Sequence, residues 1–168
     1  MIKLFALCTT IFFAAIPAHA ELNIELNIQE VTSKGGITAW LVNEPSIPMI
    51  AMNIAFQGAS TSDPVDKLGA TYLMAGLLEE GAGDMDATAF KQAAEGLASS
   101  FDFDSSRESI TITAQFLSET RDDSVALLKM AITNPAFNTS AFERTKAQVQ
   151  SIIANNETDP QDIAARAF

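Results

Sequence analysis

The chain has 168 residues, with 10 Lys and Arg against 21 Asp and Glu, so its formal net charge at pH 7 is −11. An acidic chain of this kind lacks the clustered basic side chains that neutralise phosphates, which excludes nucleic-acid binding through the phosphate backbone. The same charge opposes binding to anionic membranes.

The first 20 residues have the three parts of a secretory signal peptide. Lys3 gives a positive start, residues 4–17 are mainly apolar, and Ala18-His19-Ala20 is a small-x-small cleavage site. A membrane anchor needs about 20 apolar residues, which is longer than this run, and a lipid-modified Cys8 would lie too early within it. We therefore expect cleavage after Ala20 and a periplasmic or secreted chain with no stable membrane anchor.

Removal of residues 1–20 leaves residues 21–168, with nine basic and 21 acidic side chains and a net charge of −12. The only histidine, His19, and the only cysteine, Cys8, are lost with the leader. Ser-His-Asp triads, thiolate nucleophiles and His-rich zinc sites are therefore excluded, as are disulfides. The length suits one domain that depends on a single hydrophobic core.

Alternation predicts strands in the first third of the mature chain. Apolar residues alternate with polar ones over 22–28, a turn follows at 33–36, and a second strand covers 37–42. A third strand, at 49–56, is apolar on both faces and is expected to lie at the centre of a sheet.

Two helices are expected next. Residues 67–80 are apolar nearly all round, which predicts a buried helix that ends at Gly81. Asp86 is a suitable N-cap for a second helix with Phe90 and Ala94 on its apolar face.

The second half begins with an antiparallel hairpin, since residues 101–104 and 109–116 both alternate strictly and are joined by about four polar residues. Thr120 with Asp123 resembles a capping box, and Ser140 is a candidate cap for the following helix. Asp159 followed by Pro160 predicts the start of a last helix. The order of elements predicts an α+β fold, with a largely antiparallel sheet and helices packed on one face.

Residue types and spacing over nearly all of the mature chain resemble the start of an insulinase-type zinc peptidase domain, of the pitrilysin and mitochondrial-processing-peptidase kind. The residues that carry the resemblance are residues 36–42, Phe56-Gln57-Gly58, Asp63-Pro64, Gly69, the run Leu77-Leu78-Glu79-Glu80-Gly81-Ala82, the later hairpin, and Phe142-Glu143-Arg144 leading to Asp159-Pro160.

Active members of that family carry His-x-x-Glu-His on the first helix, where histidines at i and i+4 hold Zn²⁺ and the Glu acts as general base. Alignment on Gly69 places Tyr72 and Gly76 at the two histidine positions and Ala75 at the position of the base. The third ligand, a Glu, would fall near Gln150 or Ser151. The resemblance therefore implies a non-catalytic member, with no cofactor in this chain and zinc in a partner subunit.

In two-chain members of the family, the metal-free partner is expected to complete the peptide-binding chamber and to help hold an extended peptide. The resemblance thus implies a heterodimer with a catalytic zinc peptidase subunit, a peptide substrate, and no activity of this chain by itself. One family domain has about 200 residues, so the chain is expected to be a fragment that covers most of one domain. The alternatives are a stand-alone extracytoplasmic binding or scaffold domain, and a remnant too incomplete to fold.

Other polar groups have simpler interpretations. Glu79 and Glu80, a possible acid–base pair, are expected to be solvated charges at a helix end. Asp102 and Asp104 are expected on a solvated sheet face rather than in a Ca²⁺ site, and Tyr72 is expected in the core with its hydroxyl hydrogen-bonded.

Overall fold

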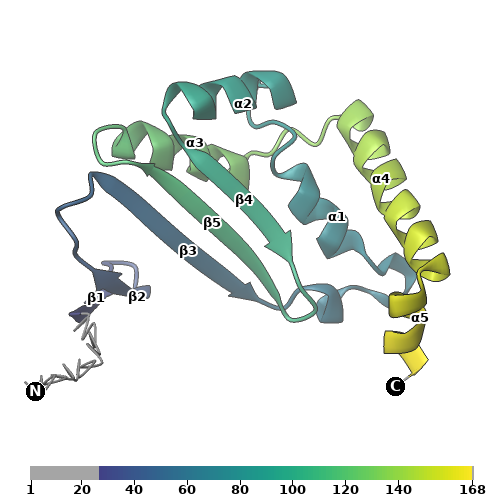
Figure 1. Cartoon of the computed structure of the whole chain (residues 1–168). Helices are drawn as coiled ribbons and strands as arrows, with labels where there is room; N and C mark the ends of the chain where they lie inside the picture. Colours follow the sequence, from purple (N-terminus) through teal and green to yellow (C-terminus); the bar gives the residue numbers. More distant parts are fainter. Residues whose placement is uncertain (1–26, 168) are drawn as a thin grey trace, which may run out of the picture. The chain divides into compact units, whose positions relative to one another are not determined.

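The computed structural model describes residues 27–167, and their side chains up to residue 164. The predicted signal peptide, its cleavage site after Ala20 and most of the first predicted strand lie outside the described residues. The chain divides into two compact units between Glu44 and Pro45 (Figure 1), and each is described by itself.

The first unit contains an antiparallel hairpin of β1 (Ile28–Thr32) and β2 (Thr38–Val42). The predicted turn and second strand are confirmed. β1 begins at Ile28, the last residue of the first predicted strand, and continues to Thr32, which the prediction did not include and which pairs with Thr38 across the turn. The hydroxyl of Ser33 accepts from the Ile37 amide at 3.0 Å and Gly36 adopts a φ of +83°, so the tight turn fixes this register.

The second unit is built on a three-stranded antiparallel sheet in the order β3-β5-β4. Its strands are β3 (Met49–Gln57), β4 (Ser100–Ser105) and β5 (Ser109–Leu117). The predicted hairpin is confirmed, with Phe103 opposite Ile112. The expectation that residues 49–56 form a central strand is wrong for this sheet. β5 is central because it pairs with both β3 and β4, and Ala51 and Ala55 of β3 are exposed.

The core lies between one face of this sheet and the helices α2 (Ala87–Gly96) and α3 (Arg121–Thr133). Phe103, Ile112, Ala114 and Phe116 come from the sheet, and the helices add Phe90, Ala94, Leu127, Leu128 and Ala131. Full burial of each large apolar side chain contributes about 1.5–3 kcal/mol. The predicted α+β fold with helices packed on one sheet face is therefore confirmed.

The ends of α2 and α3 depend on specific side-chain hydrogen bonds. Asp86 caps α2 as predicted, since its Oδ1 accepts from the Ala89 amide at 2.9 Å. The predicted capping box at Thr120 is wrong, because the Thr120 hydroxyl instead donates to the carbonyl of Leu97 at 2.8 Å. This bond joins the start of α3 to the end of α2, and the buried Ser124 hydroxyl donates to the Thr120 carbonyl at 2.7 Å within the first turn of α3.

The chain continues with α4 (Thr139–Thr158) and α5 (Pro160–Ala167). The predicted cap at Ser140 is wrong, because α4 already includes Thr139 and Asn138 precedes it. The predicted start of α5 is confirmed, since Oδ1 of Asp159 accepts from the Gln161 amide at 2.7 Å. Within residues 27–167, no helix combines the length and apolar character needed to span a bilayer.

The helix predicted at residues 67–80 is shorter than expected. Two 3₁₀ turns, η1 (Ser60–Ser62) and η2 (Val65–Lys67), precede α1 (Ala70–Leu77). The helix begins after Gly69, whose φ of +89° does not continue a right-handed helix. Leu68 is 74% exposed and Tyr72 is 44% exposed, so the expected all-round burial of this helix is wrong.

The segment after α1 is held by backbone hydrogen bonds to the connection between α3 and α4. The Gly83 amide donates to the Asn134 carbonyl at 2.8 Å, and the Ala136 amide donates to the Gly81 carbonyl at 3.0 Å. A β-bridge joins Ala82 to Pro135 between them. The end of α1 is therefore tied to the beginning of α4.

Replacement of Gly81 by alanine should destabilise the protein by about 2–4 kcal/mol. Gly81 has a φ of +125°, and an added Cβ would lie 2.4 Å from the Met85 carbonyl oxygen, in the backbone. Gly96→Ala is the matched control, because a Cβ there meets nothing within 4 Å and alanine favours the helix by up to about 1 kcal/mol. Urea unfolding of both variants measures the difference, and equal stability would contradict this role of Gly81.

Candidate functional site

Helix α1 lies between the sheet and α4, where it contacts both β4 and α4 (Figure 1). Two cavities open beside this helix, and Glu79 and Glu80 line both of them. The positions that alignment assigns to the zinc motif lie on α1. The placement of this helix therefore determines which groups surround them.

The first turn of α1 is held by the carboxylate of Asp63. The Asp63 carboxylate accepts from the Gly69 amide at 2.8 Å, from the Thr71 amide at 3.2 Å and from the Thr71 hydroxyl. The hydroxyl of Thr71 lowers the pKa of Asp63 below its ordinary value, and the amides of Gly69, Thr71 and Ala70 lower it further. This carboxylate serves as the N-terminal cap that Gly69 cannot supply.

The cavity between α1, α4 and β4 has a volume of about 310 Å³. The three motif positions Tyr72, Ala75 and Gly76 all line it, as the i, i+3 and i+4 spacing predicts. Its other walls are Glu79, Glu80, Phe103, Asp104, Ser105, Thr145, Gln148, Val149 and Ile152.

Helix α4 forms one wall of this cavity, next to the region predicted for the third ligand. Gln150 and Ser151, predicted near the third ligand position, do not line the cavity. The lining residues of α4 are Thr145, Gln148, Val149 and Ile152, which follow the i, i+3, i+4 and i+7 spacing of one helix face. That face continues from the buried residues Ala141 and Thr145, and residues 150 and 151 fall outside it.

The donor set of this cavity does not fit a zinc ion. Zinc in proteins takes thiolate, imidazole or carboxylate ligands in a tetrahedral arrangement, and the motif positions supply a phenol, a methyl group and a hydrogen atom. Within residues 27–167 no group of three or more His, Cys, Asp and Glu side chains is placed to hold a metal ion. Gly76 lies against α4, and a Cβ there would lie 3.4 Å from the Thr145 methyl group, within ordinary van der Waals contact.

Tyr72 lies at the surface, and the expectation of a core tyrosine is wrong. Its side chain is 44% exposed, and its hydroxyl makes no hydrogen bond within the described part of the chain. By contrast, the hydroxyl oxygen of Thr145 is buried and lacks a hydrogen-bond partner among the described residues. Asp102 and Asp104 are exposed on β4.

The outer edge of β4 presents backbone groups that no strand of the described sheet pairs. At the hairpin turn, the Ser106 amide donates to the Ser109 carbonyl at 2.9 Å, so these two residues form a hydrogen-bonded pair. In an antiparallel ladder, hydrogen-bonded pairs alternate with pairs whose amides and carbonyls point outward. The amides and carbonyls of Phe101, Phe103 and Ser105 therefore point away from β5. This edge runs past both cavities, since Phe101 lines one and Phe103 and Ser105 line the other.

Glu79 lies between the two cavities and contacts the edge directly. Its Oε1 accepts from the outward amide of Phe103 at 3.4 Å. Burial raises the pKa of Glu79, the Phe103 amide lowers it, and the nearby carboxylates of Asp102 and Glu80 raise it again. The sequence interpretation of Glu79 as a solvated helix-end charge missed this contact, although an acidic residue next to an apolar run was a visible signal.

Glu80 has a different environment from Glu79. It forms an ion pair with Arg144 of α4, whose guanidinium donates to the Glu80 carboxylate. The pair links the end of α1 to α4 across the cavity rim. The two adjacent glutamates are therefore inequivalent, since the charge of Glu80 is compensated and that of Glu79 meets only a backbone amide.

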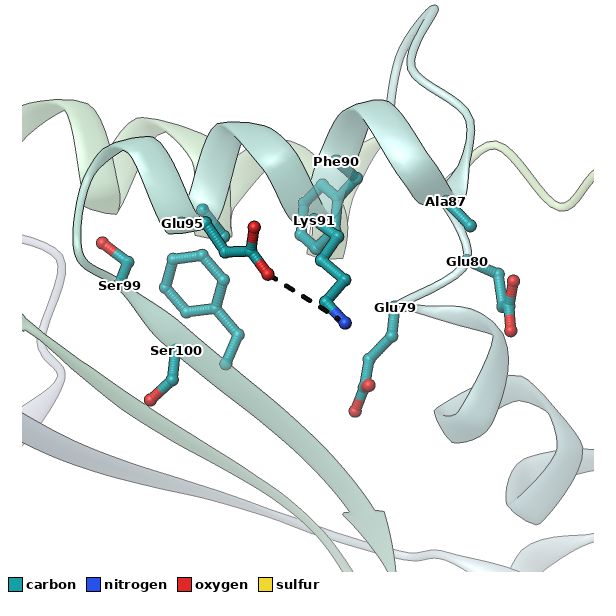
Figure 2. Close-up of a pocket in the computed structure, with 10 residues that line it drawn as sticks. Glu79, Glu80, Ala87, Phe90, Lys91, Glu95, Ser99 and Ser100 are labelled. Carbon is teal, nitrogen blue, oxygen red and sulfur yellow. Dashed lines mark ion pairs between the residues drawn. The ribbon is translucent and has the colours of Figure 1, made fainter.

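The larger cavity, of about 460 Å³, lies between α2, the start of β4 and the end of α1. Figure 2 shows its residues: Phe90, Lys91 and Glu95 come from α2, and Ser99 and Ser100 lead into β4. Phe101, Ala87, Ala94, Glu79 and Glu80 complete the lining. Sequence reasoning did not find this cavity, because it forms from segments that no shared motif connects.

Residues 39–168 match the profile of the insulinase family, peptidase family M16. The chain belongs to this family. A curated relative described as non-peptidase homolog YmxG, from Helicobacter pylori (strain ATCC 700392 / 26695), is 33% identical over 113 residues. The match covers 67% of this chain and 26% of that protein.

Solved structures show the same fold. A peptidase M16 inactive domain from Pseudomonas fluorescens matches with a TM-score of 0.77 and 23% identity, over 83% of this chain and 34% of that one. A protease from Helicobacter pylori matches with a TM-score of 0.68 and 14% identity, over 82% and 33%. The chain thus spans about a third or less of the length of these relatives.

The role of Asp63 predicts a pH-dependent stability. Because folding lowers the pKa of Asp63, its contribution is present above the unfolded-state pKa of about 3.9 and is lost as the pH falls through the folded-state value. Asp63→Asn should therefore be less stable than wild type at pH 7, and the difference should shrink below pH 4. Chemical unfolding at a series of pH values measures this. A difference independent of pH would contradict it, and Asp66→Asn, on the same loop, serves as control.

Proposed function

We propose that this chain is a non-catalytic insulinase-family domain that holds an extended peptide for a catalytic partner. The observation that carries the proposal is the cavity of Tyr72, Ala75 and Gly76, which occupies the place of the motif and lies beside the free edge of β4. A site that lacks metal ligands and lies next to an unpaired strand edge is suited to binding a peptide and not to cleaving it.

The non-catalytic part of the proposal is supported by the chemistry of the motif positions. No His-x-x-Glu-His sequence occurs anywhere in the 168 residues, and the only histidine is His19. Two relatives, described as a non-peptidase homolog and an inactive peptidase domain, agree with this. Zinc and the general base would accordingly belong to the partner.

The peptide-holding part rests on the backbone of β4. Unpaired amides and carbonyls on a sheet edge bind an extended peptide as an added strand, with main-chain hydrogen bonds for affinity and pockets for side chains. The outward groups of Phe101 and Ser105 lie on either side of the Glu79 contact, and each is next to a cavity. β4 has six residues, so its edge is long enough to pair with a short strand.

The partner we propose is a zinc-containing subunit of the same family, in a heterodimer whose chamber this chain helps to enclose. The chain spans about a third of the solved family members it matches, so further family domains are needed to enclose a peptide. The site of action we propose is outside the cytoplasm, after cleavage following Ala20.

Co-expression with a family member that carries His-x-x-Glu-His tests the proposal. The chain alone should contain substoichiometric zinc and should not hydrolyse peptides, and it should co-purify with the catalytic chain and raise its peptide hydrolysis several-fold. Stoichiometric zinc and hydrolysis by the chain alone would contradict the non-catalytic role. A folded chain that binds no catalytic partner would favour the scaffold alternative.

The β4 edge is tested within the same complex by two substitutions at one position. Ser105→Pro removes an outward amide, a change that edge strands tolerate, and should weaken peptide binding about five- to tenfold. Ser105→Ala keeps the amide and is the matched control, with binding close to wild type. Equal binding by both variants would show that this amide does not hold the peptide.

A further inference from the structure

The cavity between α2 and β4 has a composition that suits a long basic side chain. Its inner wall includes the rings of Phe90 and Phe101, with centroids 6.3 Å apart, and the methyl groups of Ala87 and Ala94. Its polar groups are mainly carboxylates, from Glu79, Glu80 and Glu95. Lys and Arg carry an apolar stem that packs on such surfaces and a cation that remains at a polar rim.

The charges of this cavity are unevenly compensated. Lys91 lies 4.0 Å from Glu95, and Arg144 pairs with Glu80. Glu79 is an exposed residue that lines the cavity, and no described basic side chain pairs with it, so its carboxylate has no counter-ion among the described residues. Figure 2 shows Glu79 on the opposite side of the cavity from Glu95, with the end of Lys91 between them.

We propose that this cavity binds a Lys or Arg side chain of a peptide paired with the edge of β4, with Glu79 as its counter-ion. The inference rests on the peptide-holding function proposed above and adds the class of side chain that the site selects. A strand added beside β4 places alternate side chains on the face of the sheet that carries α2, where the cavity lies. One such side chain, next to Phe101, enters the cavity.

A basic side chain in the cavity would also affect the contact between Glu79 and the edge of β4. In the free chain the Glu79 carboxylate accepts from the Phe103 amide, one of the groups an added strand would use. A cation in the cavity attracts this carboxylate and stabilises its charged form. The basic side chain therefore competes with the Phe103 amide for Glu79 and frees that amide for the peptide backbone.

The test compares two labelled peptides, each a short extended run of Thr and Val with one central residue, either Arg or its neutral analogue citrulline. Fluorescence anisotropy in 150 mM salt measures the affinity of the purified chain for each. The wild-type chain should prefer the Arg peptide by about tenfold, as expected for a charge-assisted hydrogen bond. This comparison needs no protein variant.

Three substitutions assign the preference to the cavity. Glu79→Gln keeps an acceptor for the Phe103 amide and should reduce the ratio of affinities to about one, with the citrulline peptide little affected. Lys91→Gln removes a competing cation and should raise the ratio. Glu119→Gln, an exposed carboxylate outside the cavity lining, changes the net charge equally and should leave the ratio unchanged.

The outcomes separate this inference from the function on which it rests. Equal affinity for the two peptides, or a preference that Glu79→Gln does not change, would overturn the basic-side-chain pocket and leave the peptide-holding function intact. Failure of the chain to bind either peptide would overturn both. A ratio that Glu119→Gln lowers as much as Glu79→Gln would show that overall charge, and not this cavity, selects the peptide.

Discussion

The position of α1 beside the edge of β4 is the constraint on which both cavities depend. Asp63 holds the first turn of the helix through the amides of Gly69 and Thr71, and the turn at Gly81 joins its other end to the segment before α4. Between these two anchors, Gly76 of α1 lies beside Thr145 of α4. The helix is thereby fixed so that Glu79 reaches the edge of β4. The outward backbone groups of β4 and the two cavities then lie along the same edge.

Much of the fold follows from local sequence patterns, and the errors have local causes. The strict alternation around Phe103 and Ile112 predicted the hairpin, and Asp86 and Asp159 predicted the starts of α2 and α5, because each signal depends on neighbours in the chain. Thr120 was assigned to a cap, but a tertiary partner, the Leu97 carbonyl, takes its hydroxyl. The order of strands in the sheet could not be predicted from the apolar character of β3, because strand order depends on pairing between segments far apart in the sequence.

The candidate site was predictable where helical geometry alone determines it. The spacing of Tyr72, Ala75 and Gly76 placed them on one cavity wall, as observed. The third-ligand region near Gln150 and Ser151 stays a prediction, and Val149 and Ile152 of α4, which line the cavity, flank it. The role of Glu79 could not be predicted, because its partner, the Phe103 amide, is brought to it only by the tertiary packing of α1 against β4.

Backbone hydrogen exchange of β4, with and without a saturating extended peptide, tests the central claim most directly, since a peptide held as an added strand must accept the outward amides. The account predicts that the amides of Phe101 and Ser105 exchange rapidly in the free chain and at least about tenfold more slowly in the complex. Amides that point toward β5, such as that of Asp102, should change far less. Peptide binding that protects residues elsewhere and leaves Phe101 and Ser105 unchanged would contradict the account.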